Sequence, residues 1–316
     1  MDDSSREEQC PELGGVSRRA FMRFCASLVA ALAVPGCSGE QAAEVLREAA
    51  GGKPAVLWLN GQDCNGCSIE FLNLDDDEQR GTPSIARVIL EKISLRYHEA
   101  LMAGSGHVAE QTKADVIASG GYILVVEGAI PGADDRYCVV GGASIREVLL
   151  EAARNAAFVI ALGSCAATGG IVARTPTQGR PVRTIVTTRP VINLPMCPAS
   201  AEHLLLTIVH LMTTNAAPEL DEQGRPTMFF GADHSVHEAC KRLPAFLQGK
   251  YLTDWNDPSQ KDYCLVLRGC RGPVTRSDCS GRKFNGGVAV CTEVGSPCQG
   301  CAESSYYDGT PLYQIG

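Results

Sequence analysis

Short apolar runs alternate with amphipathic segments over residues 54–214, and this pattern predicts a sheet covered by helices. Four runs have the length of buried strands and end in turn-forming or polar residues. Three segments repeat apolar residues at helical spacing, and Ser84 and Ser144 stand where N-caps are expected. Continuous apolar strands separated by helices form parallel sheets with both faces covered. The expected strands are residues 55–59, 122–126, 158–162 and 191–194, and the expected helices are residues 84–93, 144–155 and 201–212.

The pattern changes after a polar, turn-rich stretch at 218–226 (PELDEQGRP). Beyond Met228 the periodicity largely disappears, and seven cysteines lie between Cys240 and Cys301. A segment with so little apolar periodicity needs another source of order. Bound metal clusters supply it, because their ligation energy is also folding energy. We therefore expect an α/β domain over residues 51–217 and a cluster-stabilised domain over residues 227–316.

The N-terminal 50 residues have the pattern of an export signal. Arg18 and Arg19 precede an apolar run of eleven residues at 24–34, which is too short to span a bilayer. The arginine pair indicates the twin-arginine route, which carries folded proteins and predicts a periplasmic location. Residues 34–37, which end in Cys37, loosely resemble a lipidation site, so membrane association is an alternative. No later run reaches about 18 apolar residues, and no transmembrane helix is expected.

The cysteine content changes this picture more than the charge does. The chain has 316 residues, with 36 acidic and 28 basic side chains, and its net charge of −8 argues against a nucleic-acid partner. Its 15 cysteines are an odd number, so they cannot all pair within the chain. A chain of this length does not need disulfides for stability. The alternatives are secreted disulfides with a spare thiol, or metal ligation, and spacing has to distinguish them.

The first cysteine set follows the predicted strands. Cys64 and Cys67 form a CxxC turn after the first strand. Cys165 follows the third strand and Cys197 the fourth, so all four thiols are expected at one edge of the sheet. Four thiolates suit a [4Fe–4S] cluster, and Gly66 leaves the turn without a Cβ beside it. A thioredoxin-type redox CxxC is the alternative, but it leaves the two remote cysteines unexplained.

A second set combines one imidazole with three thiolates, and such a set binds either zinc or an iron–sulfur cluster. His234 is a competing ligand, but the three-residue spacing between His237 and Cys240 favours His237. The members of this set are His237, Cys240, Cys264 and Cys270.

A third set ends in another CxxC turn. It suits a [4Fe–4S] cluster, or a [3Fe–4S] cluster if one cysteine stays out. Its members are Cys279, Cys291, Cys298 and Cys301. The unassigned cysteines are Cys10, Cys25 and Cys37 in the signal region, and Cys138, which is expected to be an ordinary buried thiol.

Together the motifs resemble the small subunit of periplasmic nickel–iron hydrogenases, over nearly all of residues 17–316. The order and spacing of so many motifs argue against a chance match. Besides the arginine pair, they are LWL at 57–59, CNGCS at 64–68, VEGAIP at 126–131, GSCA at 163–166, MCP at 196–198, HEAC at 237–240, CRGPVT at 270–275 and PCQGC at 297–301.

The resemblance implies a flavodoxin-like domain followed by a little-structured cluster domain. It assigns the thiols at the sheet edge to a proximal cluster, the set that begins at Cys279 to a medial cluster, and the set with His237 to a distal cluster. In this family the large subunit carries the nickel–iron site that interconverts H2 with protons and electrons. The implied partners are that large subunit, in a heterodimer, and an external electron acceptor such as a c-type cytochrome. No H2 activity is expected from this chain alone.

Three positions distinguish branches of the family. Many members have proline where Cys291 stands. A cysteine at this position is similar to the pattern of the nickel–iron–selenium hydrogenases, and this similarity implies three [4Fe–4S] clusters. An oxygen-tolerant branch has extra cysteines where Gly66 and Ser68 stand, so its protective cluster is not expected here. The alternatives are the cluster subunit of a complex I-like machine, which lacks the three-motif C-terminal domain, and a zinc-stabilised structural protein.

Overall fold

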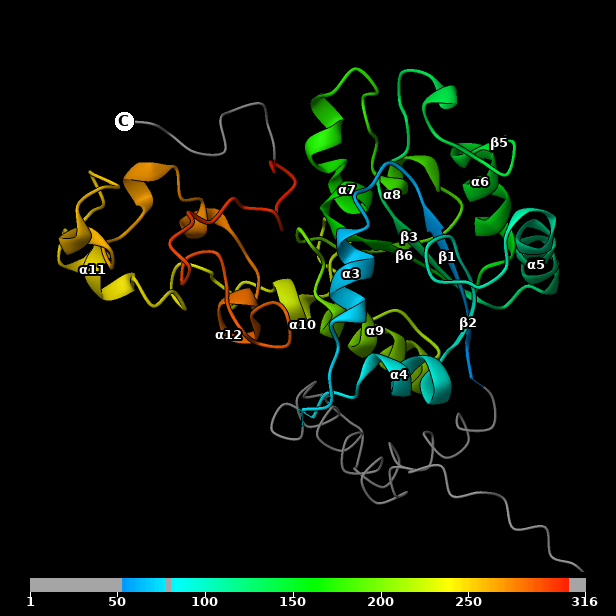
Figure 1. Cartoon of the computed structure of the whole chain (residues 1–316), viewed down its shortest axis with the longest axis horizontal. Coiled ribbons are helices and arrows are strands. Elements are labelled where there is room, and N and C mark those ends of the chain that lie inside the picture. The colour runs from blue at the N-terminus through cyan, green and yellow to red at the C-terminus, as the bar shows by residue number, and fades with distance from the viewer. Residues whose placement is uncertain (1–52, 78–80, 307–316) are drawn as a thin grey trace, which may run out of the picture.

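The computed structural model describes residues 53–77 and 81–306, and it contains a parallel sheet beside a second, irregular region (Figure 1). All four expected strands are present, with boundaries shifted by one residue at most, and an additional strand pairs beside the first. Every pairing in the five-stranded sheet is parallel, and the order β2-β1-β3-β6-β7 is that of flavodoxin-like folds. The predicted fold class is therefore confirmed. The strands are β1 (Ala55–Asn60), β2 (Ser94–His98), β3 (Ile123–Glu127), β6 (Phe158–Leu162) and β7 (Val191–Leu194).

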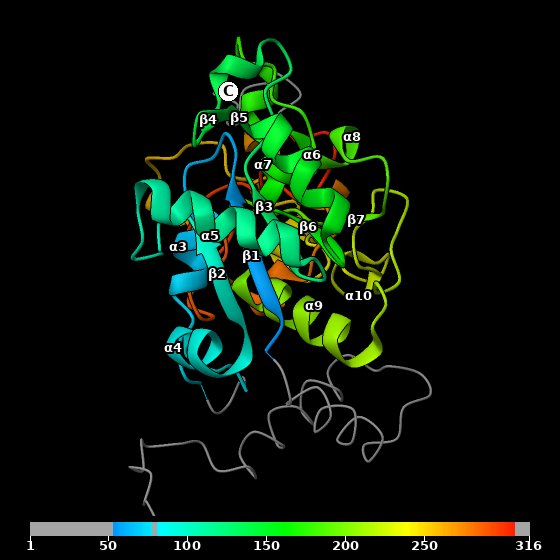
Figure 2. The same ribbon diagram turned by 90° about the vertical axis from the view of Figure 1, so that its right-hand side faces the viewer.

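The two faces of the sheet bury separate apolar cores. Successive side chains of a strand point to opposite faces, so Trp58 and Leu59 of β1 belong to different cores. Helices cover both faces, which explains why the strands are continuously apolar (Figure 2). One face packs against α3 (Gly66–Leu72) and α9 (Ala201–Thr214), and the other packs against α5 (Gly106–Ser119) and α6 (Ile145–Asn155).

Two of the three expected helices, α6 and α9, are confirmed. Ser144 caps α6 in a reciprocal capping box with Glu147, as predicted. Residues 84–93 behave differently, because α4 (Ile85–Arg87) runs directly into a π-helical turn at Val88–Lys92. Ser84 occupies the N-cap position of α4, as predicted, but its side chain makes no capping hydrogen bond.

The region from residue 227 to residue 306 has little regular structure. Its helices have four or five residues each, and the residues described there form isolated bridges but no strand. Figure 1 shows this region beside the sheet domain, next to α3 and α9. The helices are α10 (Thr227–Phe230), α11 (Leu243–Leu247) and α12 (Cys279–Arg282), with 3-10 turns at Pro258–Gln260, Val266–Arg268 and Gly272–Val274.

A buried polar network attaches α12 to α9. Nε2 of His203 lies 2.7 Å from Oδ1 of Asp278, and Arg282 donates to Asp278 at 2.7 Å and to Glu202 at 2.6 Å. Burial lowers the pKa of His203, so the imidazole is neutral and Arg282 supplies the charge that compensates Asp278. The ring of His203 also stacks on Phe229 at 4.1 Å between centroids.

The remaining elements connect these parts. They are α7 (Gly163–Thr168), α8 (Val182–Ile185), the short pair β4 (Val139–Val140) and β5 (Ala143–Ser144), and 3-10 turns at Asp135–Tyr137 and Gly170–Arg174. Within the described residues, no helix combines the length and apolar character needed to cross a bilayer. The predicted signal segment and Cys10, Cys25 and Cys37 lie outside the described residues.

Candidate metal centres

The first cysteine set gathers at the carboxyl edge of the sheet. Cys64 lies in the turn between β1 and α3, where Asn65 adopts a left-handed conformation with φ of 56°, and Cys67 lies in the first turn of α3. Cys165 is on α7, directly after β6, and Cys197 follows β7. The turn after β1 is at the point where the strand order reverses, which is where open α/β sheets bind ligands. Strand topology thus brings together four thiols that are spread over 134 sequence positions.

Glycines leave the space that these sulfur atoms occupy. A Cβ added to Gly163, whose φ is 84°, would lie 2.5 Å from Sγ of Cys67. A Cβ on Gly170 would lie 2.9 Å from Sγ of Cys165. At the predicted position Gly66, a Cβ would lie 3.1 Å from Sγ of Cys64. These clearances, with four sulfur donors, fit a bulky sulfur-ligated cluster.

A buried carboxylate fixes the backbone of the CxxC turn. Glu127, the last residue of β3, accepts the backbone N–H of Cys67 at 3.0 Å and both the N–H and the hydroxyl of Ser68, at 3.1 and 2.5 Å. Nδ1 of His98 accepts an N–H from Ala100, so its Nε2 carries the proton and donates to the Ser68 hydroxyl at 3.0 Å. Burial raises the pKa of Glu127 and lowers the pKa of His98 to about 4.

Buried surroundings also act on the thiols themselves. Burial raises the pKa of Cys165 to about 12 and raises the pKa of Cys67 well above its usual range. The backbone N–H of Ala199 donates to Sγ of Cys67 at 3.3 Å. Burial raises the pKa of Cys197, and a hydrogen bond from the hydroxyl of Tyr306 opposes this effect. Sequence reasoning gave no role to Glu127, Ser68 or Tyr306, because only tertiary structure places them here.

The third cysteine set forms a separate group in the irregular region. Cys279 begins α12, and its thiol lies within electrostatic reach of Cys298 and Cys291. Cys301 is likewise close to Cys298 and Cys279. Burial raises the pKa of Cys279 to about 12 and that of Cys298 to about 11. All four members predicted from spacing, Cys291 included, therefore share one neighbourhood.

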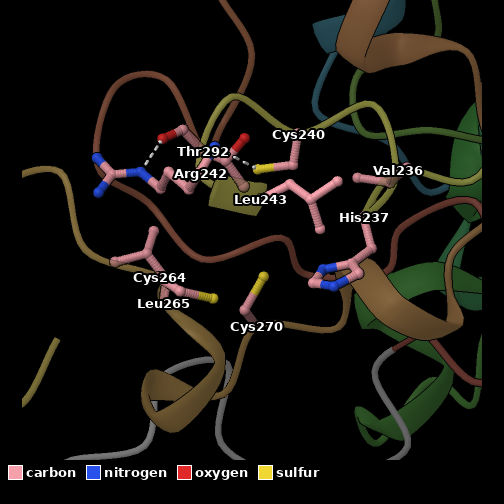
Figure 3. Close-up of a pocket in the computed structure, with 10 residues that line it drawn as sticks. Val236, His237, Cys240, Arg242, Leu243, Cys264, Leu265, Cys270 and Thr292 are labelled. Atoms are coloured by element: carbon pink, nitrogen blue, oxygen red, sulfur yellow. Dashed lines mark hydrogen bonds between the residues drawn. The ribbon is translucent and has the colours of Figure 1, made fainter. Parts of the chain in front are cut away.

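The second set lines a pocket with about 310 Å³ of empty space, part of which is open solvent (Figure 3). Around it lie the imidazole of His237 and the thiols of Cys240, Cys264 and Cys270. His234 is not among the lining residues, and its Nε2 lies 3.9 Å from the carboxylate of Asp233. The competing histidine is thus directed elsewhere, and the donor set expected from spacing is the one that surrounds the pocket.

Arg242 holds the rim of this pocket in place. Its Nε donates to the carbonyl of Thr292 at 2.7 Å, and its backbone N–H donates to Sγ of Cys240 at 3.4 Å (Figure 3). The ring of His237 packs edge-on against Phe246, with 4.6 Å between centroids. These protein contacts by themselves fix the positions of the His237 imidazole and the Cys240 thiol.

Hydrogen bonds connect the three sets in one order. The backbone N–H of Cys197, in the first set, donates to Sγ of Cys301 in the third. The backbone N–H of Cys298, in the third set, donates to Sγ of Cys270 in the second at 3.3 Å. The sets therefore follow one another from the sheet edge to the pocket of Figure 3.

Among the described residues, no three His, Cys, Asp or Glu side chains converge closely enough to share one metal ion.

Cys138, expected to be buried, is partly exposed, and burial raises its pKa to about 11.

Comparison with known proteins agrees with this arrangement. The family model for the 20 Kd subunit of NADH ubiquinone oxidoreductase matches residues 64–211, which places the α/β domain in a class of oxidoreductase subunits. The model for the C-terminal part of the NiFe/NiFeSe hydrogenase small subunit matches residues 233–314. The second match separates the chain from complex I-like subunits.

Relatives cover most of the chain. The uptake hydrogenase small subunit of Azotobacter vinelandii is 37% identical over 308 residues, which are 95% of this chain and 83% of the relative. The hydrogenase-2 small chain of Escherichia coli K12 is 37% identical over 310 residues, which are 95% of this chain and 80% of the relative. The NiFeSe hydrogenase structure from Desulfomicrobium baculatum has a TM-score of 0.74 and 32% identity, and covers 83% of this chain and 99% of that one.

The chain therefore belongs to the nickel–iron hydrogenase small-subunit family, as the motifs indicated. Membership makes it part of an oxidoreductase complex, paired with a large subunit in a heterodimer. The family also implies iron–sulfur clusters in the small subunit and a nickel–iron site in the large one.

Proposed function

We propose that this chain is the electron-transfer subunit of a periplasmic hydrogenase and carries three [4Fe–4S] clusters. The proximal cluster uses Cys64, Cys67, Cys165 and Cys197; the medial cluster uses Cys279, Cys291, Cys298 and Cys301; the distal cluster uses His237, Cys240, Cys264 and Cys270. The clusters accept and release single electrons between the large subunit and an external acceptor such as a c-type cytochrome. The observation that carries the proposal is the gathering of twelve predicted ligands into three groups in series.

Iron analysis of the purified heterodimer tests the cluster count. Three cubane clusters require about twelve iron atoms. The medial set is the discriminating one, because loss of Cys291 as a ligand leaves three cysteines and favours a [3Fe–4S] cluster. About eleven irons, with a [3Fe–4S] signal in electron paramagnetic resonance (EPR) of the oxidised protein, would contradict the assignment of Cys291.

The distal ligand is tested with a matched pair of variants. His237→Gly removes the imidazole from the pocket, whereas His234→Gly removes the neighbouring imidazole outside it. We expect His237→Gly to slow electron delivery to an acceptor and to leave hydrogen–deuterium exchange at the large subunit intact, since that exchange needs no outward electron flow. Impaired delivery in His234→Gly alone would move the ligand to His234. Equal loss of both activities in His237→Gly would indicate a folding defect.

Export is tested at the N-terminus. Arg18→Lys and Arg19→Lys together keep the positive charge and remove the twin-arginine pair. We expect the double variant to accumulate as folded heterodimer in the cytoplasm, as cell fractionation would reveal. A double variant that still reached the periplasm would refute the assigned route.

The relatives named uptake hydrogenases support H2 oxidation as the direction of the reaction.

A further inference from the structure

Ser164 touches the ligand segments of two proposed clusters at once. It directly precedes Cys165, and its hydroxyl donates to the backbone carbonyl of Cys301 at 2.6 Å. The same oxygen accepts the backbone N–H of Met196, which precedes Cys197, at 3.2 Å. The backbone N–H of Ser164 returns a bond to the carbonyl of Met196 at 2.9 Å. One side chain, only 1% exposed, thus joins two proximal ligand segments to a medial one.

This contact is a short hydrogen bond between the proximal and medial ligand segments, and it lies beside the bond from the backbone N–H of Cys197 to Sγ of Cys301. From Cys165 the path runs along covalent bonds to Oγ of Ser164, crosses a single 2.6 Å hydrogen bond, and continues along the backbone of Cys301. Electron transfer between two centres depends steeply on their separation and on the bonds between them. A short, buried hydrogen bond at this point therefore affects both quantities.

We infer that Ser164 is a positioning residue that sets the spacing and electronic coupling between the proximal and medial clusters. The inference rests on the proposed cluster assignment and assigns a residue to the step between the first two clusters. The Ser164 hydroxyl binds no metal and moves no proton in this role. It holds the Cys301 segment against the loops that carry Cys165 and Cys197.

Other contacts keep the two segments folded together when this hydroxyl is absent. The guanidinium of Arg225 donates to the carbonyl of Ala302 at 2.8 Å and to the Glu303 carboxylate at 3.1 Å. Asn193 on β7 holds the segment next to Arg225, because its backbone N–H donates to the carbonyl of Gly224 at 2.8 Å and its side-chain amide donates to the carbonyl of Gln223 at 2.6 Å. Segment 301–303 therefore remains attached to the sheet domain in a Ser164→Ala variant, which also keeps the bond from the N–H of Cys197 to Sγ of Cys301 and loses the Ser164 hydroxyl bond.

The experiment uses the intact heterodimer and three variants. Ser164→Ala removes the hydroxyl, and Ser164→Thr retains it. Ser144→Ala is the control, because the Ser144 hydroxyl also donates one hydrogen bond and accepts one, in both cases with Glu147 at the start of α6. Iron content and the EPR signals of the unaltered protein are measured first. If the unaltered protein lacks the proximal or the medial cluster, the proposed function itself is contradicted.

Two readouts then test the inference. The first is the magnetic interaction between the two clusters in EPR, and the second is the rate at which the medial signal changes after rapid mixing with H2. We expect Ser164→Ala to weaken the interaction and slow the medial change several-fold, with hydrogen–deuterium exchange unaltered and Ser164→Thr close to the unaltered protein.

Two results overturn the inference. One is a Ser164→Ala variant that matches Ser144→Ala in both readouts, which would leave Ser164 an ordinary structural serine. The other is a Ser164→Ala variant that fails to bind its clusters while Ser164→Thr binds them, which would make the hydroxyl an assembly element instead.

Discussion

Replacing Tyr306 with phenylalanine removes one hydroxyl group beside a proposed proximal ligand. The side chain of Tyr306 is only 6% exposed, and its hydroxyl donates to Sγ of Cys197. Burial, reinforced by the nearby thiols of Cys197, Cys301 and Cys165, raises the pKa of this phenol. The hydroxyl therefore keeps its proton at every physiological pH and acts on the sulfur only as a donor.

The size of the expected effect follows from the charge on the acceptor. A hydrogen bond to a charged group contributes about 1.5–3 kcal/mol. The reduced cluster carries one more negative charge than the oxidised cluster, so the bond is stronger in the reduced state. A tenfold change in the equilibrium constant for one-electron reduction corresponds to 59 mV and to about 1.4 kcal/mol. If about 1 kcal/mol of the hydrogen-bond energy is the difference between the two states, the midpoint potential of the cluster falls by about 40 mV in Tyr306→Phe.

The measurement is a redox titration of the proximal cluster followed by EPR. Tyr122→Phe is the matched control, because Tyr122 is fully buried and donates to the carbonyl of Ala152 at 2.6 Å, on the side of the sheet that packs against α6. We expect a lower potential in Tyr306→Phe and no shift in Tyr122→Phe. An unchanged or raised potential in Tyr306→Phe, with its iron content intact, would refute the reasoning.

Three further substitutions test other parts of the structure. Gly163→Ala places a Cβ 2.5 Å from Sγ of Cys67 at a φ of 84°, so iron analysis should find about four irons fewer, whereas Gly281→Ala, with open space around its Cβ, should lose none. Asp278→Ala leaves His203 and Arg282 without their shared acceptor, which should lower the free energy of unfolding by about 3–5 kcal/mol. The visible absorbance of the clusters should therefore bleach at a lower temperature than in the control Asp254→Ala, which changes an exposed residue. Cys291→Pro should convert one four-iron signal to a [3Fe–4S] signal, and an unchanged spectrum would contradict Cys291 as a ligand.

Strand positions and cysteine spacing were predictable because both are local patterns. The strands at Phe158–Leu162 and Val191–Leu194 are short apolar runs with clear ends, and the structure reproduces them. Parallel topology then places the cysteines that follow such strands at one edge. This reasoning needs no knowledge of any side-chain contact, which is why it extends across the whole first set.

The elements that were missed lack such a pattern. In α5, Lys113 is buried while Val108 is exposed, so polar and apolar positions do not separate into two faces. In strand β2, Arg96 separates the apolar residues, and the last residue is the buried His98. The strand also comes directly after residues 84–93, which were expected to be helical. Both elements are stabilised by packing against the sheet rather than by their own sequence pattern.

The contacts around the ligands were also beyond sequence reasoning. Ser164 and Cys301 are 137 positions apart, and only the docking of the C-terminal region brings them together. Glu127 stands within a motif that the sequence did reveal, but its role depends on the CxxC turn, which lies 59 or 60 positions earlier. Motifs therefore identified the ligands, whereas the groups that orient them required the fold.

The buried thiols link cluster binding to the folding of the C-terminal region. Burial raises the pKa of Cys279 to about 12 and that of Cys298 to about 11, so without a cluster these thiols are protonated at neutral pH. Ligation requires thiolates, so binding displaces protons and adds its free energy to a region whose helices have only four or five residues. The polar network of His203, Asp278 and Arg282 can attach that region to α9 only when α12 is formed. Cluster insertion should therefore precede complete folding, and a chain that needs its metal to fold is suited to a route that exports folded proteins, as the N-terminal arginine pair predicts.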